Sequence, residues 1–330
     1  MKPSRVASVL ESLTAARWPV FVWGPPGCGK SSLVRAVAAE RKVPVIDIRA
    51  SLLDPTDLRG IPMIEGGRAV WCPPSFLPSP ADPAGILFFD ELNAAPPLVQ
   101  ASLYQLTLDR RVGEYVLPDG WAIVAAGNRS DDRSVVFRMP SALSNRFVHV
   151  DFEVDYDDWR AWAFRAGIEP SVIGFLGFRR ELLHDMRKPD RAFPTPRSWE
   201  MASTVIRQFG SVEACMDVLI GTVGEGAASE LQAFTKKALT LKQVEEIIAK
   251  PDATDLPADL GMLYALVSFL VSTVDRAPTR DACAILLDRL PIEFAVLLAR
   301  DTLRASPDLR KHPLYAAFIK SHAKSLQPRG

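Results

Sequence analysis

The amino-acid sequence predicts an α/β fold, in which helices cover a parallel sheet, followed by an all-helical C-terminal region. From Pro19 to about Asp151, short β-rich runs alternate with helical patterns, which is typical of a parallel sheet. After about Phe152 the strand signals vanish and amphipathic helical patterns replace them. The length of 330 residues corresponds to about two domains. We therefore expect an α/β domain over residues 1–152 and a helical lid with further helices over residues 153–330.

Five runs rich in β-branched and aromatic residues are the strand candidates: Val20–Trp23, Val43–Ile48, Ile86–Phe89, Trp121–Ala126 and Phe147–Phe152. Helices are expected at Lys30–Arg41 and Pro97–Leu108, where apolar residues recur at helical spacing. Two insertions interrupt this alternation. Gly60–Pro78 is too rich in proline and glycine for a long helix, and its Gly66-Gly67 pair predicts a hairpin tip. A second hairpin is expected over residues 111–120, before the strand at Trp121.

Helical patterns make up the second half of the chain, for example at Trp159–Ala166, Val172–Met186, Arg197–Gln208 and Val212–Ile220. Gly210 is expected to end a helix. The longest uncharged apolar stretch, Leu260–Val274, is shorter than the roughly 20 residues that cross a bilayer. It predicts a buried helix, and we expect no association with a membrane.

Composition argues against several classes of protein. The 39 basic and 39 acidic residues cancel, so the chain lacks the net positive charge of a dedicated nucleic-acid binder. The N-terminus has no apolar stretch typical of a signal peptide. The four cysteines form no C-x-x-C pair, which favours a reducing compartment. We therefore expect a cytoplasmic protein.

A phosphate-binding loop follows the first predicted strand and precedes the first predicted helix, which is the context that the pattern G-x-x-x-x-G-K-[ST] requires. Glycines let the backbone curl around a phosphate, and the N-terminus of the helix favours an anion. Lys30 is expected to reach the outer phosphates and Ser31 to bind Mg²⁺. The nucleotide-binding candidates are Gly24, Pro25, Pro26, Gly27, Cys28, Gly29, Lys30, Ser31 and Ser32.

Polar residues also end two later strands. Asp90 and Glu91 follow the apolar run Ile86–Phe89 at its C-terminal end, where open α/β sheets bind ligands. We expect Asp90 to bind Mg²⁺ and Glu91 to activate the water that attacks the γ-phosphate. Asn128 follows the next strand and could contact both that water and the γ-phosphate without adding negative charge.

The order of these motifs resembles that of AAA+ ATPases, and in particular their MoxR branch. The resemblance covers about residues 5–210. It rests on the phosphate loop and on the segments Asp57-Leu58-Arg59-Gly60-Ile61-Pro62, Asp90-Glu91-Leu92-Asn93-Ala94-Ala95-Pro96, Ala126-Gly127-Asn128-Arg129, Leu143-Ser144-Asn145-Arg146-Phe147 and Pro194-Thr195-Pro196-Arg197-Ser198-Trp199.

This resemblance implies a P-loop NTPase core of the AAA+ type and assigns roles to single residues. Asn128 would be sensor 1, Arg146 the arginine finger that acts on a neighbouring subunit, and Arg197 sensor 2. The two insertions would face the central pore of a ring, which the resemblance implies is a hexamer. It further implies chaperone-like remodelling of a protein, with a von Willebrand factor A domain partner supplied by another chain.

The sequence thus predicts a Mg²⁺-dependent ATPase that binds ATP and assembles into a ring. Two alternatives remain open at this level. One is a nucleic-acid motor, since Arg110-Arg111 lies beside a predicted pore hairpin, although the neutral net charge does not favour it. The other is a scaffold that assembles on ATP and hardly hydrolyses it, which does not require Glu91, Asn128 and Arg146 together.

Overall fold

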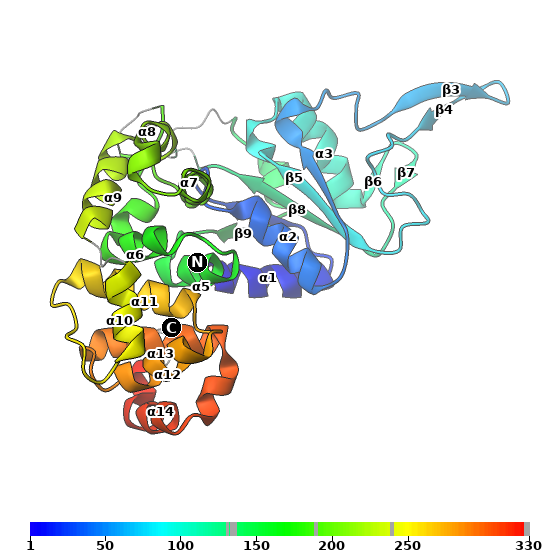
Figure 1. Ribbon diagram of the computed structural model, residues 1–330. Coiled ribbons are helices and arrows are strands. Elements are labelled where there is room, and N and C mark those ends of the chain that lie inside the picture. The colour runs from blue at the N-terminus through cyan, green and yellow to red at the C-terminus, as the bar shows by residue number, and fades with distance from the viewer. Residues whose placement is uncertain (130–131, 133–136, 188–190, 238–240, 327–330) are drawn as a thin grey trace. The chain divides into compact units, whose positions relative to one another are not determined.

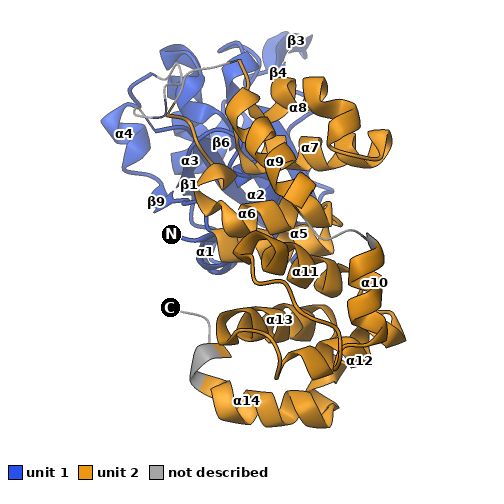
Figure 2. Ribbon diagram, turned by 60° about the vertical axis from the view of Figure 1, so that its left-hand side comes forward, with its two compact units in different colours: residues 1–155 blue, residues 156–330 orange. Residues whose placement is uncertain are grey.

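The computed structural model describes residues 1–129, 132, 137–187, 191–237 and 241–326 (Figure 1). The chain divides into two compact units, Met1–Asp155 and Tyr156–Gly330 (Figure 2). All the strands in the described ranges belong to the first unit, and the second unit is helical there. No helix in these ranges is both long and apolar enough to cross a membrane.

A five-stranded parallel sheet forms the centre of the described part of the first unit, with the strand order β2–β5–β8–β1–β9. Its strands are β1 (Val20–Trp23), β2 (Val45–Arg49), β5 (Gly85–Asp90), β8 (Trp121–Gly127) and β9 (Val148–Asp151). The predicted α/β class with a parallel sheet is confirmed, and the strand ends lie within one or two residues of those predicted.

Helices cover both faces of this sheet, and its three central strands, β1, β5 and β8, are apolar along almost their whole length. The helices are α1 (Pro3–Ala15), α2 (Lys30–Glu40) and α3 (Pro97–Asp109). Val20 and Val22 of β1 pack in one core with residues of α1 and α2. Phe21, which lies between them, points to the opposite face and packs in a second core with residues of α3. Sequence analysis did not predict α1, which begins with a proline in its first turn.

Two antiparallel hairpins extend the first unit. The longer one pairs β3 (Ile61–Glu65) with β4 (Arg68–Cys72) and projects away from the sheet (Figure 1). Its turn consists of Gly66 and Gly67, whose φ angles of +57° and +76° suit glycine and match a two-residue hairpin turn. The shorter hairpin pairs β6 (Arg111–Val112) with β7 (Tyr115–Val116).

Side chains anchor the shorter hairpin to the body of the first unit. The Arg110 guanidinium donates hydrogen bonds to the carbonyls of Pro118 and Trp121 at 2.9 and 2.7 Å. The Tyr115 hydroxyl donates to the carbonyl of Pro78 at 2.8 Å. Burial raises the pKa of Tyr115 to about 12, so this hydroxyl remains a donor at neutral pH.

The described part of the second unit is built from ten α-helices and short 3₁₀ turns: α5 (Tyr156–Arg165), α6 (Pro170–Phe178), α7 (Pro196–Phe209), α8 (Met216–Val223), α9 (Glu225–Lys237), α10 (Leu241–Ala249), α11 (Leu260–Ser272), α12 (Ala277–Leu286), α13 (Ile292–Ala305) and α14 (Pro313–Leu326). α11 packs against α6 and α13 and confirms the predicted buried helix. The Asp259 side chain accepts a hydrogen bond from the Met262 amide and caps its start. Gly210, with φ of +86°, ends α7 as predicted.

The predicted helix Val172–Met186 is wrong in its second half. α6 ends at Phe178, because Arg179 leaves the helical region with φ of −124° and ψ of +65°. Its guanidinium forms ion pairs with Glu181 and Glu230, and a 3₁₀ turn follows over Arg180–Leu183. The helix predicted from Val212 likewise begins later, at Met216, after a 3₁₀ turn.

A buried ion pair joins α5 to α13. Arg160 Nε lies 2.7 Å from Asp301 Oδ2, and both side chains are almost completely excluded from solvent. Burial alone would lower the pKa of Arg160, but Asp301 and Tyr156 together raise it above its usual value. Without Asp301 the Arg160 guanidinium would be an uncompensated charge in the core, whereas Asp301 has a second cationic partner, Arg300, whose Nε lies 3.2 Å from Asp301 Oδ1.

We expect Asp301→Ala to lower the free energy of unfolding by about 3–5 kcal/mol, because it leaves Arg160 buried without its counterion. Asp308→Ala is the matched control, since it removes an exposed pair with Lys311 and should change stability little. Denaturant unfolding followed by circular dichroism measures both variants. Equal stabilities of the two variants would contradict this role of the buried pair.

Candidate functional site

The parallel sheet brings three separate segments of the chain to one edge. Trp23, the last residue of β1, is in register with Gly127, the last residue of β8. β5 lies on the other side of β8, with Phe89 in register with Ala125. The phosphate loop, Asp90 and Asn128 therefore leave the sheet at its carboxyl edge, where ligands of open α/β sheets bind.

The phosphate loop has the backbone of an anion site. Gly27 and Gly29 have φ angles of +72° and +104°, which favour glycine. A Cβ atom added at Gly29 would meet no heavy atom within 4 Å, so the space beside this residue is open. α2 begins directly afterwards without a side-chain cap, which leaves the amide groups of its first turn available to an anion.

Lys30 connects the loop to β8. Its buried ammonium group donates to the carbonyls of Gly24 and Pro25 at 2.6 and 3.0 Å. It also donates to Asn128 Oδ1 at 3.0 Å. Since an ammonium group can only donate, the Asn128 amide must present its oxygen to Lys30.

Ser31 and Asp90 present a pair of oxygen atoms that could bind a metal ion. Ser31 Oγ donates to Asp90 Oδ2 at 2.6 Å, and the other Asp90 oxygen accepts from the Glu91 amide at 2.9 Å. Hydroxyl and carboxylate oxygens suit Mg²⁺, which commonly takes one or two protein ligands and completes its shell with water and phosphate oxygens. No group of three or more His, Cys, Asp or Glu side chains that could hold a metal occurs in the described ranges. The residues present thus fit Mg²⁺ bound together with a phosphate.

Glu91 lies beside this pair in a strained conformation. Its φ of +54° is uncommon for a residue with a side chain, and such strain clusters at functional sites. The exposed carboxylate accepts a hydrogen bond from Ser51 Oγ at 2.8 Å. Ser51 follows β2 in a 3₁₀ turn, and sequence analysis missed it because a single serine after a strand carries no signal.

Asn93, which lies shortly after Asp90 and Glu91, holds the backbone of Asn128. The buried Asn93 amide donates to the Asn128 carbonyl at 2.7 Å. A Cβ added at Gly127 would lie 2.3 Å from Asn93 Oδ1, so this contact requires glycine in β8. Asn93 is the second residue of the site that sequence analysis missed as a contact, although it occurs in the segment that carries the family resemblance.

The remaining loop residues contribute shape more than polar groups. Pro25 and Pro26 are half-buried. Cys28 is buried, and burial raises the pKa of its thiol despite the nearby charge of Lys30. The raised pKa disfavours the reactive thiolate form. Ser32 is exposed, and none of the described side-chain hydrogen bonds involves its hydroxyl.

Two predicted residues are not part of this cluster. Arg146 follows the short helix α4 (Ser141–Ser144), and its guanidinium lies 5.8 Å from the centre of the Tyr104 ring. Its Nε atom is buried and has no hydrogen-bond partner within the described part of the chain. Arg197 lies in the second unit, where it is exposed on the first turn of α7.

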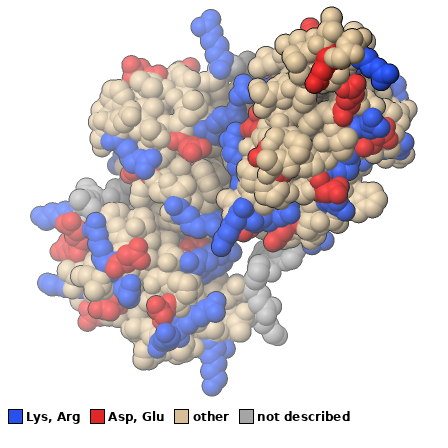
Figure 3. Space-filling view, turned by 90° about the vertical axis from the view of Figure 1, so that its right-hand side faces the viewer, with Lys and Arg blue, Asp and Glu red and all other residues tan. Residues whose placement is uncertain are grey.

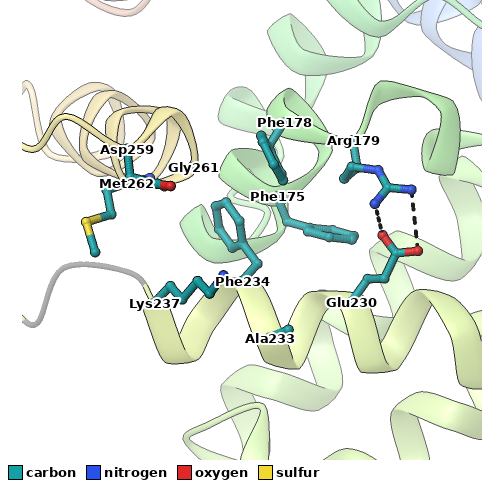
Figure 4. A pocket seen from close by; sticks show the side chains of 10 residues that line it. All are labelled: Phe175, Phe178, Arg179, Glu230, Ala233, Phe234, Lys237, Asp259, Gly261 and Met262. Carbon is teal, nitrogen blue, oxygen red and sulfur yellow. Dashed lines mark hydrogen bonds and ion pairs between the residues drawn. The ribbon is translucent and has the colours of Figure 1, made fainter.

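The second unit has a pocket of its own, with a volume of about 230 Å³, between α6, α9 and the start of α11 (Figure 4). Phe175, Phe178 and Phe234 form its apolar wall. The ion pair of Arg179 with Glu230 closes one end, as the dashed lines in Figure 4 show. None of the predicted site residues lines this pocket.

Comparison with known proteins identifies the domain that carries the cluster. Residues 19–147 match the AAA domain of the dynein-related subfamily. Protein NorQ of Paracoccus denitrificans is 30% identical over 154 residues, which are 44% of this chain and 56% of NorQ. Protein MoxR of Paracoccus denitrificans is 31% identical over 170 residues, or 49% of each chain.

An uncharacterised AAA domain-containing protein of Schizosaccharomyces pombe is 37% identical over 120 residues, which are 34% of this chain and 14% of that protein. The matched part of this chain thus spans about half the length of NorQ and MoxR, and less of the yeast protein. These similarities confirm the resemblance to the MoxR branch of AAA+ ATPases that the sequence motifs indicated.

We expect Ser31→Ala to remove most of the Mg²⁺ dependence of nucleotide binding, because it removes one of the two paired oxygen ligands. Ser32→Ala is the matched control, since it deletes an exposed hydroxyl and keeps the backbone amide. Titration of a fluorescent ATP analogue with and without Mg²⁺ measures the effect. The same Mg²⁺ dependence in both variants would exclude Ser31 as a ligand.

Proposed function

Because residues 19–147 form an AAA domain similar to MoxR and NorQ, we propose that the chain is a Mg²⁺-dependent ATPase that works as a ring of identical subunits on a partner protein. One observation carries the proposal. Two side-chain hydrogen bonds join the predicted residues at the carboxyl edge of the sheet. Lys30 donates to Asn128 at 3.0 Å, and Ser31 donates to Asp90 at 2.6 Å. Glu91 stands directly beside them.

Each member of the cluster has a distinct part in hydrolysis. Amide groups of the loop and the Lys30 ammonium neutralise the β- and γ-phosphates. Ser31 and Asp90 would hold Mg²⁺, which when bound would supply further positive charge to the phosphate oxygens. Glu91 accepts the proton of the attacking water, and Asn128 orients that water against the γ-phosphate.

Arg146 acts on the nucleotide of the neighbouring subunit. Its half-buried guanidinium is held against Tyr104 and keeps a buried Nε donor without a partner in the described part of its own chain. A phosphate of the adjacent subunit would supply an acceptor, and such an arginine can raise the rate of phosphoryl transfer by several orders of magnitude. For Arg197 we retain the role of sensor 2, which acts on the same reaction from the helical unit.

The longer hairpin supports a protein as the target. Ile61, Met63, Ile64 and Trp71 are all exposed on it, and 86% of Ile64 is accessible to solvent. Figure 3 looks toward the side from which β3 and β4 project, and uncharged residues make up much of the foreground. Exposed apolar surface of this kind is typical of a protein-binding site. We propose that this hairpin contacts the remodelled protein or a von Willebrand factor A domain partner.

The shorter hairpin argues against a nucleic-acid motor. Arg110 is one of its two adjacent arginines, and its guanidinium donates hydrogen bonds to the carbonyls of Pro118 and Trp121. Arg111 alone of the pair is exposed. Steeply salt-dependent DNA binding with DNA-stimulated hydrolysis would favour the nucleic-acid alternative instead.

We expect Glu91→Gln to bind Mg²⁺ and ATP normally but to hydrolyse ATP roughly 10²–10⁴-fold more slowly, because the amide cannot accept a proton. Glu114→Gln, a change of the same kind on the exposed turn between β6 and β7, is the control. Phosphate release under saturating ATP measures the rates. Wild-type turnover in the Glu91 variant would reject this residue as the base.

Subunits that lack Arg146 should regain activity when they are mixed with subunits that lack Lys30. Arg146→Ala and Lys30→Ala should each be nearly inactive alone, yet a mixed ring joins an intact phosphate loop to an intact arginine from its neighbour. The test is hydrolysis by the mixture, with mixed assemblies verified by differential labelling. Failure to recover any activity in verified mixed rings would disprove the shared site.

A further inference from the structure

An aromatic cluster links the phosphate loop to the segment that carries Arg146. Trp23 is the last residue of β1 and directly precedes Gly24. Its Nε1 donates to Nδ1 of His149 in β9 at 2.8 Å, and the two rings stack with 23° between their planes. Phe21 packs against Phe147 with ring centres 5.6 Å apart, so the start of β9 is fixed to β1 by two neighbouring ring contacts.

The hydrogen bond from Trp23 determines the tautomer of His149. An indole N–H can only donate, so His149 Nδ1 must be unprotonated. In the neutral ring the proton is then on Nε2, which donates to the carbonyl of Ser144 at 2.9 Å. The neutral ring therefore acts as a directional bridge from β1 to α4.

Ser144 is the last residue of α4 and lies two positions before Arg146. The turn is closed by hydrogen bonds from the Arg146 amide to the Leu143 carbonyl and from the Phe147 amide to the Ser144 carbonyl, both 3.1 Å long. On its other side Arg146 contacts only the ring face of Tyr104 among its described polar and ring interactions. The bridge thus anchors the backbone that orients the guanidinium.

We propose that Trp23 and His149 are positioning residues for Arg146. They fix the Arg146 backbone against the strand that leads into the phosphate loop of the same subunit. The nucleotide in that loop therefore influences the orientation of the Arg146 guanidinium, which acts on the nucleotide of the next subunit. This inference rests on the proposed function, since it assigns the bridge a role in hydrolysis across the subunit boundary.

Substitutions that remove one hydrogen-bonding group of the bridge separate this role from simple packing. Trp23→Phe keeps an aromatic ring and removes the N–H donor, whereas Trp18→Phe removes an exposed indole that makes none of the described hydrogen bonds. His149→Asn offers an acceptor toward Trp23 but cannot reach the Ser144 carbonyl. His149→Gln offers a donor to the Ser144 carbonyl but no acceptor at the position of Nδ1 for Trp23. We expect Trp23→Phe and both His149 variants to lower kcat by about 10–100-fold. Affinity for a non-hydrolysable ATP analogue and ring assembly should match those of the wild type, as should all properties of Trp18→Phe.

A double-mutant cycle gives the decisive result. If the bridge acts through Arg146, Trp23→Phe should lower the single-turnover rate little or not at all in the Arg146→Ala background. The full 10–100-fold loss in that background, or a wild-type kcat in Trp23→Phe, would overturn the inference while wild-type hydrolysis still supports the proposed function. Absence of hydrolysis by the wild-type assembly would contradict the proposed function itself, and with it any role for the bridge in that reaction.

Discussion

The parallel pairing of β1 with both β8 and β9 is the constraint on which the functional groups of the first unit depend. On one side, the register of Trp23 with Gly127 sets the phosphate loop beside Asn128. On the other side, the register of Val20 with Val148 sets the segment that leads from Arg146 into β9 beside the start of β1, at the end of that strand opposite the phosphate loop. Sheet pairing alone thus brings together residues that are about 100 positions apart in the sequence.

Hydrogen bonds within the cluster then orient the side chains that the sheet has collected. Lys30 donates hydrogen bonds to two loop carbonyls and to the Asn128 side chain. The Asn93 side chain in turn donates a hydrogen bond to the Asn128 carbonyl. The contact between Asn93 and β8 leaves no room for a side chain at Gly127. Few of these groups could change without moving a neighbour, which is the preorganisation that phosphoryl transfer requires.

Sequence analysis predicted the site residues that occur in local patterns of the chain. Lys30, Ser31 and Asp90 occur in short patterns, and the strands before them are apolar because both faces of the sheet are covered. Ser51 and Asn93 were missed as contacts because their partners lie 40 and 35 residues away, and such pairing depends on strand order. The early end of α6 was missed for a similar reason, since Arg179 turns toward Glu230 on a distant helix.

A calorimetric titration with a non-hydrolysable ATP analogue and Mg²⁺ tests most directly whether Lys30, Ser31, Asp90 and Asn128 form one nucleotide site. The wild-type chain should bind one nucleotide per subunit. Lys30→Ala should bind at least about tenfold more weakly, because it removes a buried charged donor from the phosphates. Equal affinity in the two proteins, or no binding by the wild type, would contradict the account.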